Sequence, residues 1–328
     1  MASIASRMIG VEFGSNTLKM AVCDRGIVKK MAFERMPDDL VREGRVSSPA
    51  AMTEFLKTMM KNQGIRGGNC ALVLPSSMVI GHHVSMPAMS ESELKLNLPF
   101  EFRDFVGKEG VKYDYDYSVM SIKDNVMELY AAAVRKDTVE ELYSIFKKAG
   151  LTLKIATPAE MAWLNLIRQN ENLPKKLCIV DVGHNTTRVN IFANGNFVMG
   201  KDIDLAGSLI DQTISDTQQI DVHAARTRKE SNMNGILTSD LVNEAYQSLA
   251  IEVMKTVNFF RYSDQTEGGP LEHLYYCGGS AVVEPLRTCL LKATNMTMHH
   301  VQRLVKMDGA SADQALYCAL AAGAGCQI

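Results

Sequence analysis

The sequence predicts an α/β protein built from two related halves, and two observations support this prediction. First, one hairpin pattern occurs twice, in which an apolar strand ends in an acid, an apolar residue and a glycine before a second strand. The copies run from Ile9 to Val22 and from Cys178 to Ile191. Second, short apolar runs alternate with segments of helical periodicity, as in layered α/β domains. Because the glycine lets successive N–H groups face an anion, two such hairpins suit a polyphosphate.

Length and charge limit the classes of protein. With 328 residues, 46% of them hydrophobic, the chain is long enough for two domains of ordinary size. A net charge of -2 gives no reason to expect nucleic-acid binding. No apolar run approaches the roughly 20 residues of a membrane span, and Met1 to Arg7 lacks the apolar core of a signal peptide. We therefore expect a soluble cytoplasmic protein.

Cysteine and histidine give no indication of a metal centre. The seven cysteines form no CxxC pair and lie mostly among apolar neighbours, so we expect reduced, buried thiols. His82-His83 and His299-His300 are adjacent pairs. Neighbouring side chains on a strand point to opposite faces, so neither pair should share one metal ion.

Residues 1–86 are expected to form the first core. Ser48 is placed to cap a helix that has Pro49 in its first turn, and Pro87 ends the last strand. The expected elements are strands at about 8–22, 27–35, 70–74 and 78–86 and a helix at 49–62.

Residues 87–156 are expected to form a small inserted α+β subdomain. Ser90 and Glu93 are typical of a helix start, and Leu94, Leu98, Phe102 and Phe105 are its apolar positions. Pro99 must kink or interrupt that helix. Strands at 113–121 and 126–134 follow, joined by a turn at 123–125. Asp137 is expected to cap a helix that ends before Gly150, and a strand covers 151–155.

The remaining chain repeats the layered pattern. A helix at 158–168 and a polar stretch form an expected linker over 157–175, and the second core is expected over 176–309. Asn194-Gly195 predicts a hairpin turn after the second copy of the repeated pattern. Helices are expected at about 205–219, 222–230, 239–262 and from 283, with a strand at 273–276, and a helix rich in Ala and Gly lies within 310–328.

Five segments in order resemble the actin-like ATPase superfamily. They are the first hairpin, the helix after Pro158, the second hairpin, the turn Gly278-Gly279-Ser280 and the terminal Ala/Gly helix. This resemblance implies two duplicated α/β domains around a nucleotide cleft, with an insertion in the first. The entry to the insertion, Met86 to Leu94, and the run from Leu274 to Ala281 are most similar to the type IV pilus assembly PilM family, which is related to GspL.

The resemblance implies ATP and Mg²⁺ as ligands and gives roles to named residues. Asp181 would orient Mg²⁺ through water, since Mg²⁺ keeps much of its hydration shell, or it is a turn-capping acid. Glu12 would act on a metal-bound water or displace it, although the family usually carries Asp there. The residues implied to contact the nucleotide are Gly14, Ser15, Asn16, Thr17 and Lys19 in the first hairpin, Gly183, His184, Asn185 and Thr186 in the second, and Gly207, Arg226, Lys229, Gly278, Gly279 and Ser280.

Three of these positions leave alternatives open. Arg226 stands where many relatives carry Glu, so ribose recognition by a carboxylate is lost, while a guanidinium can stack on adenine. Lys229 contacts the ribose or is a solvated lysine. His184 activates water or is a turn residue, and no other residue suggests a general base.

The leading functional hypothesis is a cytoplasmic, ATP-binding adaptor of type IV pilus assembly or a related secretion system. It would dock on the cytoplasmic tail of a PilN-like inner-membrane protein, reach the membrane only through that partner, and be at most a slow ATPase. Met78, Met86 and Met89 suit either an adaptable groove or core filling. An FtsA-like filament protein is one alternative, although Cys318 to Ile328 shows no basic amphipathic segment. A small-molecule kinase of the same fold is a second alternative. Self-association is left open.

Overall fold

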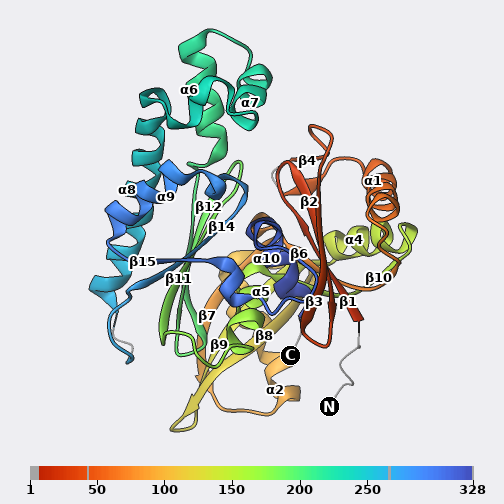
Figure 1. The fold of residues 1–328 in the computed structure, drawn as a ribbon. Coiled ribbons are helices and arrows are strands. Elements are labelled where there is room, and N and C mark those ends of the chain that lie inside the picture. The colour runs from red at the N-terminus through yellow and green to blue at the C-terminus, as the bar shows by residue number, and fades with distance from the viewer. Residues whose placement is uncertain (1–6, 43, 265–266, 327–328) are drawn as a thin grey trace. The chain divides into compact units, whose positions relative to one another are not determined.

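The computed structural model describes residues 7–42, 44–264 and 267–326, and these residues form two compact units (Figure 1). The first unit combines the chain up to residue 26 with residues 34–163 and the chain from 320 on. The second combines residues 27–33 with 164–319. Each unit is described in turn.

The core of the first unit is a mixed sheet. Strand β1 (Arg7–Phe13) pairs antiparallel with β2 (Thr17–Asp24) and parallel with β6 (Gly68–Leu74), and β6 pairs in parallel with β10 (Leu151–Pro158). Helices α1 (Pro49–Asn62) and α4 (Lys136–Lys148) lie side by side beside this sheet (Figure 1), and Phe13 stacks on Phe146 of α4. A small hairpin of β4 (Val41–Arg42) and β5 (Arg45–Val46) was not predicted. The predicted cap is confirmed, because the Ser48 side chain accepts a hydrogen bond from the Ala51 N–H.

A second, three-stranded sheet in the first unit has the order β7-β9-β8. Strands β8 (Tyr113–Lys123) and β9 (Val126–Arg135) form the expected hairpin. Strand β7 (Val79–Pro87), which precedes the expected boundary at residue 87, pairs with β9 along its whole length. Helices α2 (Glu91–Glu101) and α3 (Arg103–Val106) bury Leu94, Leu98 and Phe102 in the hydrophobic cluster of this sheet.

The start of α2 has the predicted capping box, in which the Ser90 side chain and the Glu93 carboxylate each bond the other's backbone N–H. Pro99 lies in the last turn of α2, and α3 begins four residues later, at Arg103. Phe105 is a correction to the sequence analysis. Its side chain is 56% exposed and lies at the edge of the cluster, where its ring contacts His82 with centroids 4.8 Å apart.

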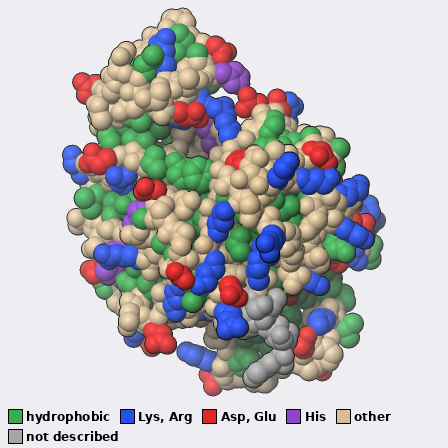
Figure 2. Space-filling view, turned by 45° about the vertical axis from the view of Figure 1, so that its right-hand side comes forward, with side chains coloured by type: hydrophobic (Ala, Val, Ile, Leu, Met, Phe, Trp, Pro, Cys, Tyr) green, Lys and Arg blue, Asp and Glu red, His purple; other side chains and the backbone are tan. Residues whose placement is uncertain are grey.

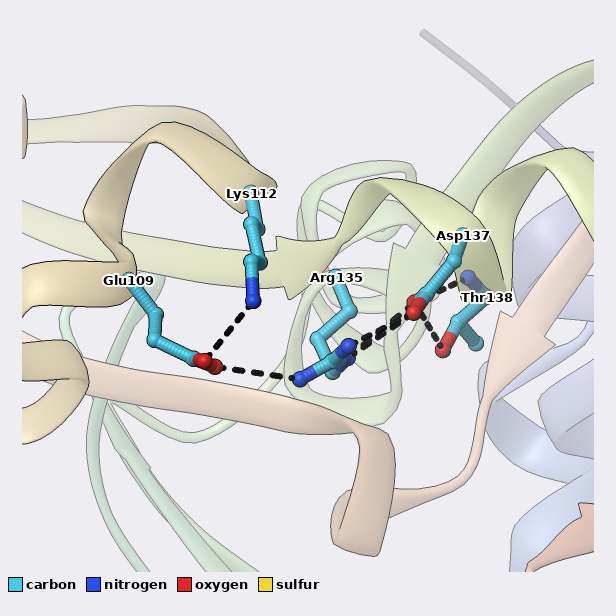
Figure 3. A network of polar contacts seen from close by, with 5 residues as sticks. All are labelled: Glu109, Lys112, Arg135, Asp137 and Thr138. Carbon is cyan, nitrogen blue, oxygen red and sulfur yellow. Dashed lines mark hydrogen bonds and ion pairs between the residues drawn. The ribbon is translucent and has the colours of Figure 1, made fainter.

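Asp137 does not cap α4, contrary to prediction. The helix already begins at Lys136, so Asp137 lies in its first turn and Arg135 occupies the cap position. The Asp137 carboxylate pairs with the Arg135 guanidinium at 2.6 Å, and Arg135 also reaches Glu109 (Figure 3). The hydrogen bond from Arg135 lowers the pKa of Asp137 to about 2. Gly150 ends this region with a φ of +83°, as expected.

The second unit contains a five-stranded sheet of order β13-β12-β11-β14-β15. Strands β11 (Lys176–Val182), β12 (Thr187–Ala193) and β13 (Asn196–Ile203) are antiparallel neighbours. Strand β14 (His273–Cys277) runs parallel to β11, and the unpredicted β15 (Thr297–His300) runs parallel to β14. Asn194 and Gly195 both have positive φ, as the predicted hairpin turn requires.

Helices cover one face and one end of this sheet. Helix α8 (Asp240–Ser263) lies beside α9 (Glu284–Thr294), and α6 (Gly207–Gln218) and α7 (Val222–Glu230) lie beyond the strand ends (Figure 1). The apolar side of α8 is core from Ala245 to Phe260, while Leu241 is only partly buried.

Three elements lie at or near the division between the units. Helix α5 (Ala159–Arg168) divides after Trp163, and α10 (Ala312–Gly325) divides after Ala319. Strand β3 (Ile27–Arg35) contributes residues 27–33 to the second unit.

The surface and the thiols agree with the composition. On the face in Figure 2, Lys and Arg side chains are interspersed with Asp and Glu. All seven cysteines are free thiols, and all but the half-buried Cys289 are buried. Within the described part of the chain, no helix combines the length and the apolar character that crossing a membrane requires.

Candidate functional site

The first repeated hairpin holds the residues Gly14, Ser15, Asn16 and Thr17 in a tight loop between β1 and β2. The Gly14 N–H donates to the Thr17 carbonyl at 2.9 Å, and the Asn16 carbonyl accepts from the Met36 N–H at 2.8 Å. A Cβ at Gly14 would lie 2.9 Å from that Thr17 oxygen, so the closed loop favours glycine. Ser15 is exposed at the loop tip.

Glu12 and Lys19 face each other across the same hairpin. They occupy paired positions of β1 and β2, and the Lys19 Nζ donates to Glu12 Oε1 at 2.7 Å. Both side chains are about nine-tenths buried. An ion pair with such burial keeps the charge of each partner compensated, so Glu12 is held by an ammonium group here.

The second hairpin repeats the loop geometry in the second unit. The Gly183 N–H donates to the Thr186 carbonyl at 3.1 Å, which corresponds to the bond from Gly14 to Thr17. Asn185 is exposed at the tip, and His184 and Thr186 are half-buried. The repeated sequence pattern therefore encodes the same closed loop twice.

Asp181 differs from Glu12 in its surroundings. Its side chain lies at the end of β11 and is 8% exposed, yet it has no hydrogen bond or ion pair to another described residue. A Cβ at Gly278 would lie 2.5 Å from Asp181 Oδ1, so the glycine backbone packs directly against the carboxylate. The residue is largely buried, but its carboxylate oxygens keep access to solvent, so a hydrated divalent cation could reach them and compensate the charge.

The Gly183 carbonyl joins three predicted segments at one point. It accepts a hydrogen bond from the Gly207 N–H at 3.1 Å and another from Ser280 Oγ at 2.9 Å. The Ser208 N–H also donates to the His184 carbonyl at 2.7 Å. The loop after β11, the start of α6 and the turn after β14 therefore meet, as expected where neighbouring parallel strands end at one edge.

Asp211 is a site residue that the sequence analysis missed. Its carboxylate is 1% exposed and pairs with Lys229 Nζ at 2.6 Å and with Arg226 Nε at 3.5 Å. Lys229 also donates to the Gly207 carbonyl at 2.8 Å, so it is not a solvated lysine. Burial lowers the pKa of Lys229, and the neighbouring Asp211 opposes that shift. The only signal in the sequence was an acid one turn after Gly207 on a helix side that carries Ile210 and Ile214.

His184 belongs to the same group of side chains. Its Nε2 lies 2.9 Å from Arg226 Nη2, and its Nδ1 lies 3.7 Å from Asp211 Oδ2. Because a guanidinium can only donate, His184 Nε2 accepts in this contact. The lone pair that a general base would use is directed at Arg226.

The turn after β14 is fixed from the other side by α10. Gly278 has a φ of +93°, and its N–H donates to the Leu316 carbonyl at 2.8 Å. Gly279 lies against Tyr317, which stacks on Phe33 with ring centroids 4.2 Å apart. All of the predicted residues from Asp181 to Ser280 thus lie in one region of the second unit, whereas Glu12 to Lys19 lie in the first.

Comparison with known proteins gives one family. Residues 10–318 match the family model described as type IV pilus assembly protein PilM. No curated protein sequence matches the chain.

Solved structures match over nearly the whole chain. A structure described as the PilM-PilN type IV pilus biogenesis complex matches with a TM-score of 0.84 and 20% identity, covering 98% of both chains. The ethanolamine utilization protein EutJ from Carboxydothermus hydrogenoformans matches with a TM-score of 0.62 and 15% identity, covering 97% of this chain and 90% of that one. MreB5 of Spiroplasma citri bound to ADP matches with a TM-score of 0.51 and 13% identity, covering 98% and 95%. These likenesses confirm the predicted actin-like α/β fold.

Proposed function

The chain belongs to the type IV pilus assembly protein PilM family, and we propose on this basis that it is an ATP-binding adaptor of pilus assembly. In this proposal it binds Mg²⁺-ATP and the cytoplasmic tail of a PilN-like inner-membrane protein. It resides in the cytoplasm and reaches the inner membrane through that partner.

The observation that carries the nucleotide part is the buried, unpartnered carboxylate of Asp181 beside a glycine loop. Its oxygens suit a water-mediated contact with Mg²⁺, and the loop at Gly183 offers N–H and hydroxyl donors to a phosphate. Glu12 has a weaker case as a second cation contact, because Lys19 already neutralises it. When bound, Mg²⁺ would supply charge neutralisation of the phosphate oxygens.

The other predicted residues would hold the remaining parts of the nucleotide. Gly14 to Thr17 would donate to a phosphate, with Lys19 as nearby positive charge, while Asn185 and Thr186 would contact another. Asp211 holds both Arg226 and Lys229, and Lys229 also bonds the Gly207 carbonyl, so the two side chains would supply donors in place of a ribose-accepting carboxylate. The turn Gly278-Gly279-Ser280 would support the adenosine.

Binding without rapid hydrolysis fits the site best. Turnover needs a base that orients or deprotonates water, and His184 directs its Nε2 at Arg226. We therefore propose that nucleotide sets the state of an adaptor, with at most slow hydrolysis. A small-molecule kinase would instead require a catalytic carboxylate that accepts a proton from its substrate.

Calorimetry with ATP tests the nucleotide part. We expect wild-type protein to bind ATP more tightly with Mg²⁺ than with EDTA, and Asp181→Asn to lose most of that difference. A charge-neutral variant of similar size keeps the packing against Gly278, and circular dichroism checks the fold. Equal Mg²⁺ dependence in both proteins would remove Asp181 from the site.

The partner part rests on family membership and on the likeness to the PilM-PilN complex structure. A short tail must become ordered when it binds, so its affinity should depend on a few apolar anchors. We propose that it docks beside the three-stranded sheet of the first unit. The test is titration of a labelled tail peptide against the full chain, with a scrambled peptide as control. Equal weak binding of both peptides, together with rapid phosphorylation of a small metabolite, would favour the kinase.

A further inference from the structure

Three charged residues form a row across the sheet of the second unit. Arg188 on β12 is paired in register with Asp181 on β11 and, on its other side, with Asp202 on β13. Side chains at paired positions of neighbouring strands lie on the same face of a sheet. One guanidinium therefore stands between two carboxylates.

Arg188 pairs with the acid on the β13 side. Its Nε lies 3.5 Å from Asp202 Oδ1, whereas Asp181 has no ion pair with any described residue. Asp202 is half-exposed and Asp181 is buried. The guanidinium is thus held toward the more solvated of its two acidic neighbours.

The first hairpin has the same arrangement of an acid opposite a basic residue, but a different contact. Lys19 stands opposite Glu12, as Arg188 stands opposite Asp181, and there the base bonds directly to the acid of its own hairpin. The two hairpins share loop geometry and the placement of acid and base. They differ in which carboxylate the base contacts.

We propose that Asp202 is a positioning residue that draws Arg188 away from Asp181 and thereby keeps the Asp181 carboxylate available to a hydrated divalent cation. This inference rests on the proposed nucleotide function. A guanidinium and a cation compete for the same oxygens, and a buried carboxylate gains strongly from either. Because Arg keeps its charge at every relevant pH, deprotonation cannot remove it from the competition, whereas a second acid can hold it elsewhere.

The test compares ATP affinity with Mg²⁺ and with EDTA in Asp202→Asn and wild-type protein. Asp202→Asn frees Arg188 to contact Asp181, so we expect the gain in affinity from Mg²⁺ to fall roughly threefold to tenfold. Asp202→Glu should restore most of the gain. Asp204→Asn is the matched control, because it removes the same charge from an exposed acid nearby that forms no ion pair with a described residue.

A double variant separates positioning from loss of charge. In Arg188→Gln combined with Asp202→Asn no guanidinium remains to occupy Asp181, so the Mg²⁺ dependence should return. Electron paramagnetic resonance of Mn²⁺ in the presence of ATP gives a second readout of cation contact that does not depend on turnover. An unchanged Mg²⁺ gain in Asp202→Asn, with the gain lost in Asp181→Asn, would overturn the role of Asp202 alone. Absence of ATP binding by wild-type protein would overturn the proposed function, and this inference with it.

Discussion

Gly278 lies so close to two oxygen atoms that no side chain fits there. A Cβ would lie 2.3 Å from the Val182 carbonyl oxygen and 2.5 Å from Asp181 Oδ1, and the backbone has φ +93° and ψ 155°. This backbone region is essentially restricted to glycine. The residue type is therefore required by contact and by conformation together.

We expect Gly278→Ala to lower the free energy of unfolding by about 2–4 kcal/mol. The matched control is Gly195→Ala in the same unit, where φ is +73° but no atom lies within 4 Å of the new Cβ. Only the conformational cost, about 1–2 kcal/mol, applies to that control. Urea denaturation of both variants measures the difference. Equal losses would show that the close approach to Asp181 carries no free energy.

At the scale of single residues, the sequence predicted the two glycine loops but not the ion pairs next to them. Glycines in a repeated pattern predicted both closed loops, because the requirement of a tight turn is local. Asp211 was missed, because an acid on a helix is usually solvated and only the fold buries it against Lys229 and Arg226. The ion pair of Glu12 with Lys19 was missed for the related reason that it depends on strand register.

At the scale of elements, Phe102 is the bulkiest of the side chains that α2 and α3 bury against their sheet, beside Leu94 and Leu98. Phe102 is fully buried, with ring contacts to His82 at 4.8 Å and to Tyr115 at 5.3 Å between centroids. Phe100, two residues earlier, is 60% exposed. Residues two positions apart on a helix lie on opposite sides, so these two phenylalanines have opposite environments.

Phe102→Ala should destabilise this sheet by about 3–5 kcal/mol through the cavity that it leaves. Phe100→Ala is the natural control and should change stability by less than about 0.5 kcal/mol. Hydrogen exchange of the β7 and β9 amides measures the loss of stability directly in the sheet that Phe102 packs against. Comparable exchange in the two variants would contradict the assignment of Phe102 as the anchor.

The β14 and β15 pair carries a pH-dependent contact. His299 Nε2 lies 3.0 Å from His273 Nδ1, and Arg303 Nη1 lies 2.9 Å from His299 Nδ1. Burial, then Arg303 and His273, lower the pKa of His299 below its usual 6.5. Tyr275 also packs on its ring.

A histidine with a lowered pKa in the folded state binds fewer protons than in the unfolded chain. Stability should therefore fall as pH decreases from about 6.5 toward the folded-state pKa, and be unaffected by this residue above that window. We expect His299→Gln to remove part of the loss of urea midpoint between pH 7.5 and 5.5. His223→Gln, at an exposed position on α7, is the control. An acid response in His299→Gln identical to that of wild-type protein would refute this role.

Helix and strand boundaries were predicted correctly where the sequence carries a clear local signal, and were missed elsewhere. The helix at 222–230 and the capping box at Ser90 were predicted correctly, because caps act within one turn. Asp137 was wrong as a cap because α4 begins one residue before it, at Lys136, and its carboxylate pairs with Arg135 instead. The four-residue β15 has too few residues for a pattern and forms because β14 offers an edge.

For the whole molecule, the duplication was the dominant signal. It predicted two α/β units with equivalent hairpins, and the match to known actin-like structures over almost the full length confirms that fold. The sequence could not predict which hairpin keeps an unpaired acid. That outcome depends on β13, the third strand of the second sheet, and on its Asp202.

The carbonyl oxygen of Gly183 couples three segments of the second unit, which bears on how this unit would change when it binds a ligand. This single atom receives hydrogen bonds from the start of α6 and from Ser280. A shift of the loop by a few tenths of an ångström must either carry both neighbours along or lengthen two bonds at once. We therefore expect the loop after β11, the start of α6 and the turn after β14 to move together when a ligand binds. Spectroscopic labels placed on α6 and near Ser280 should record the same event with the same midpoint and the same rate.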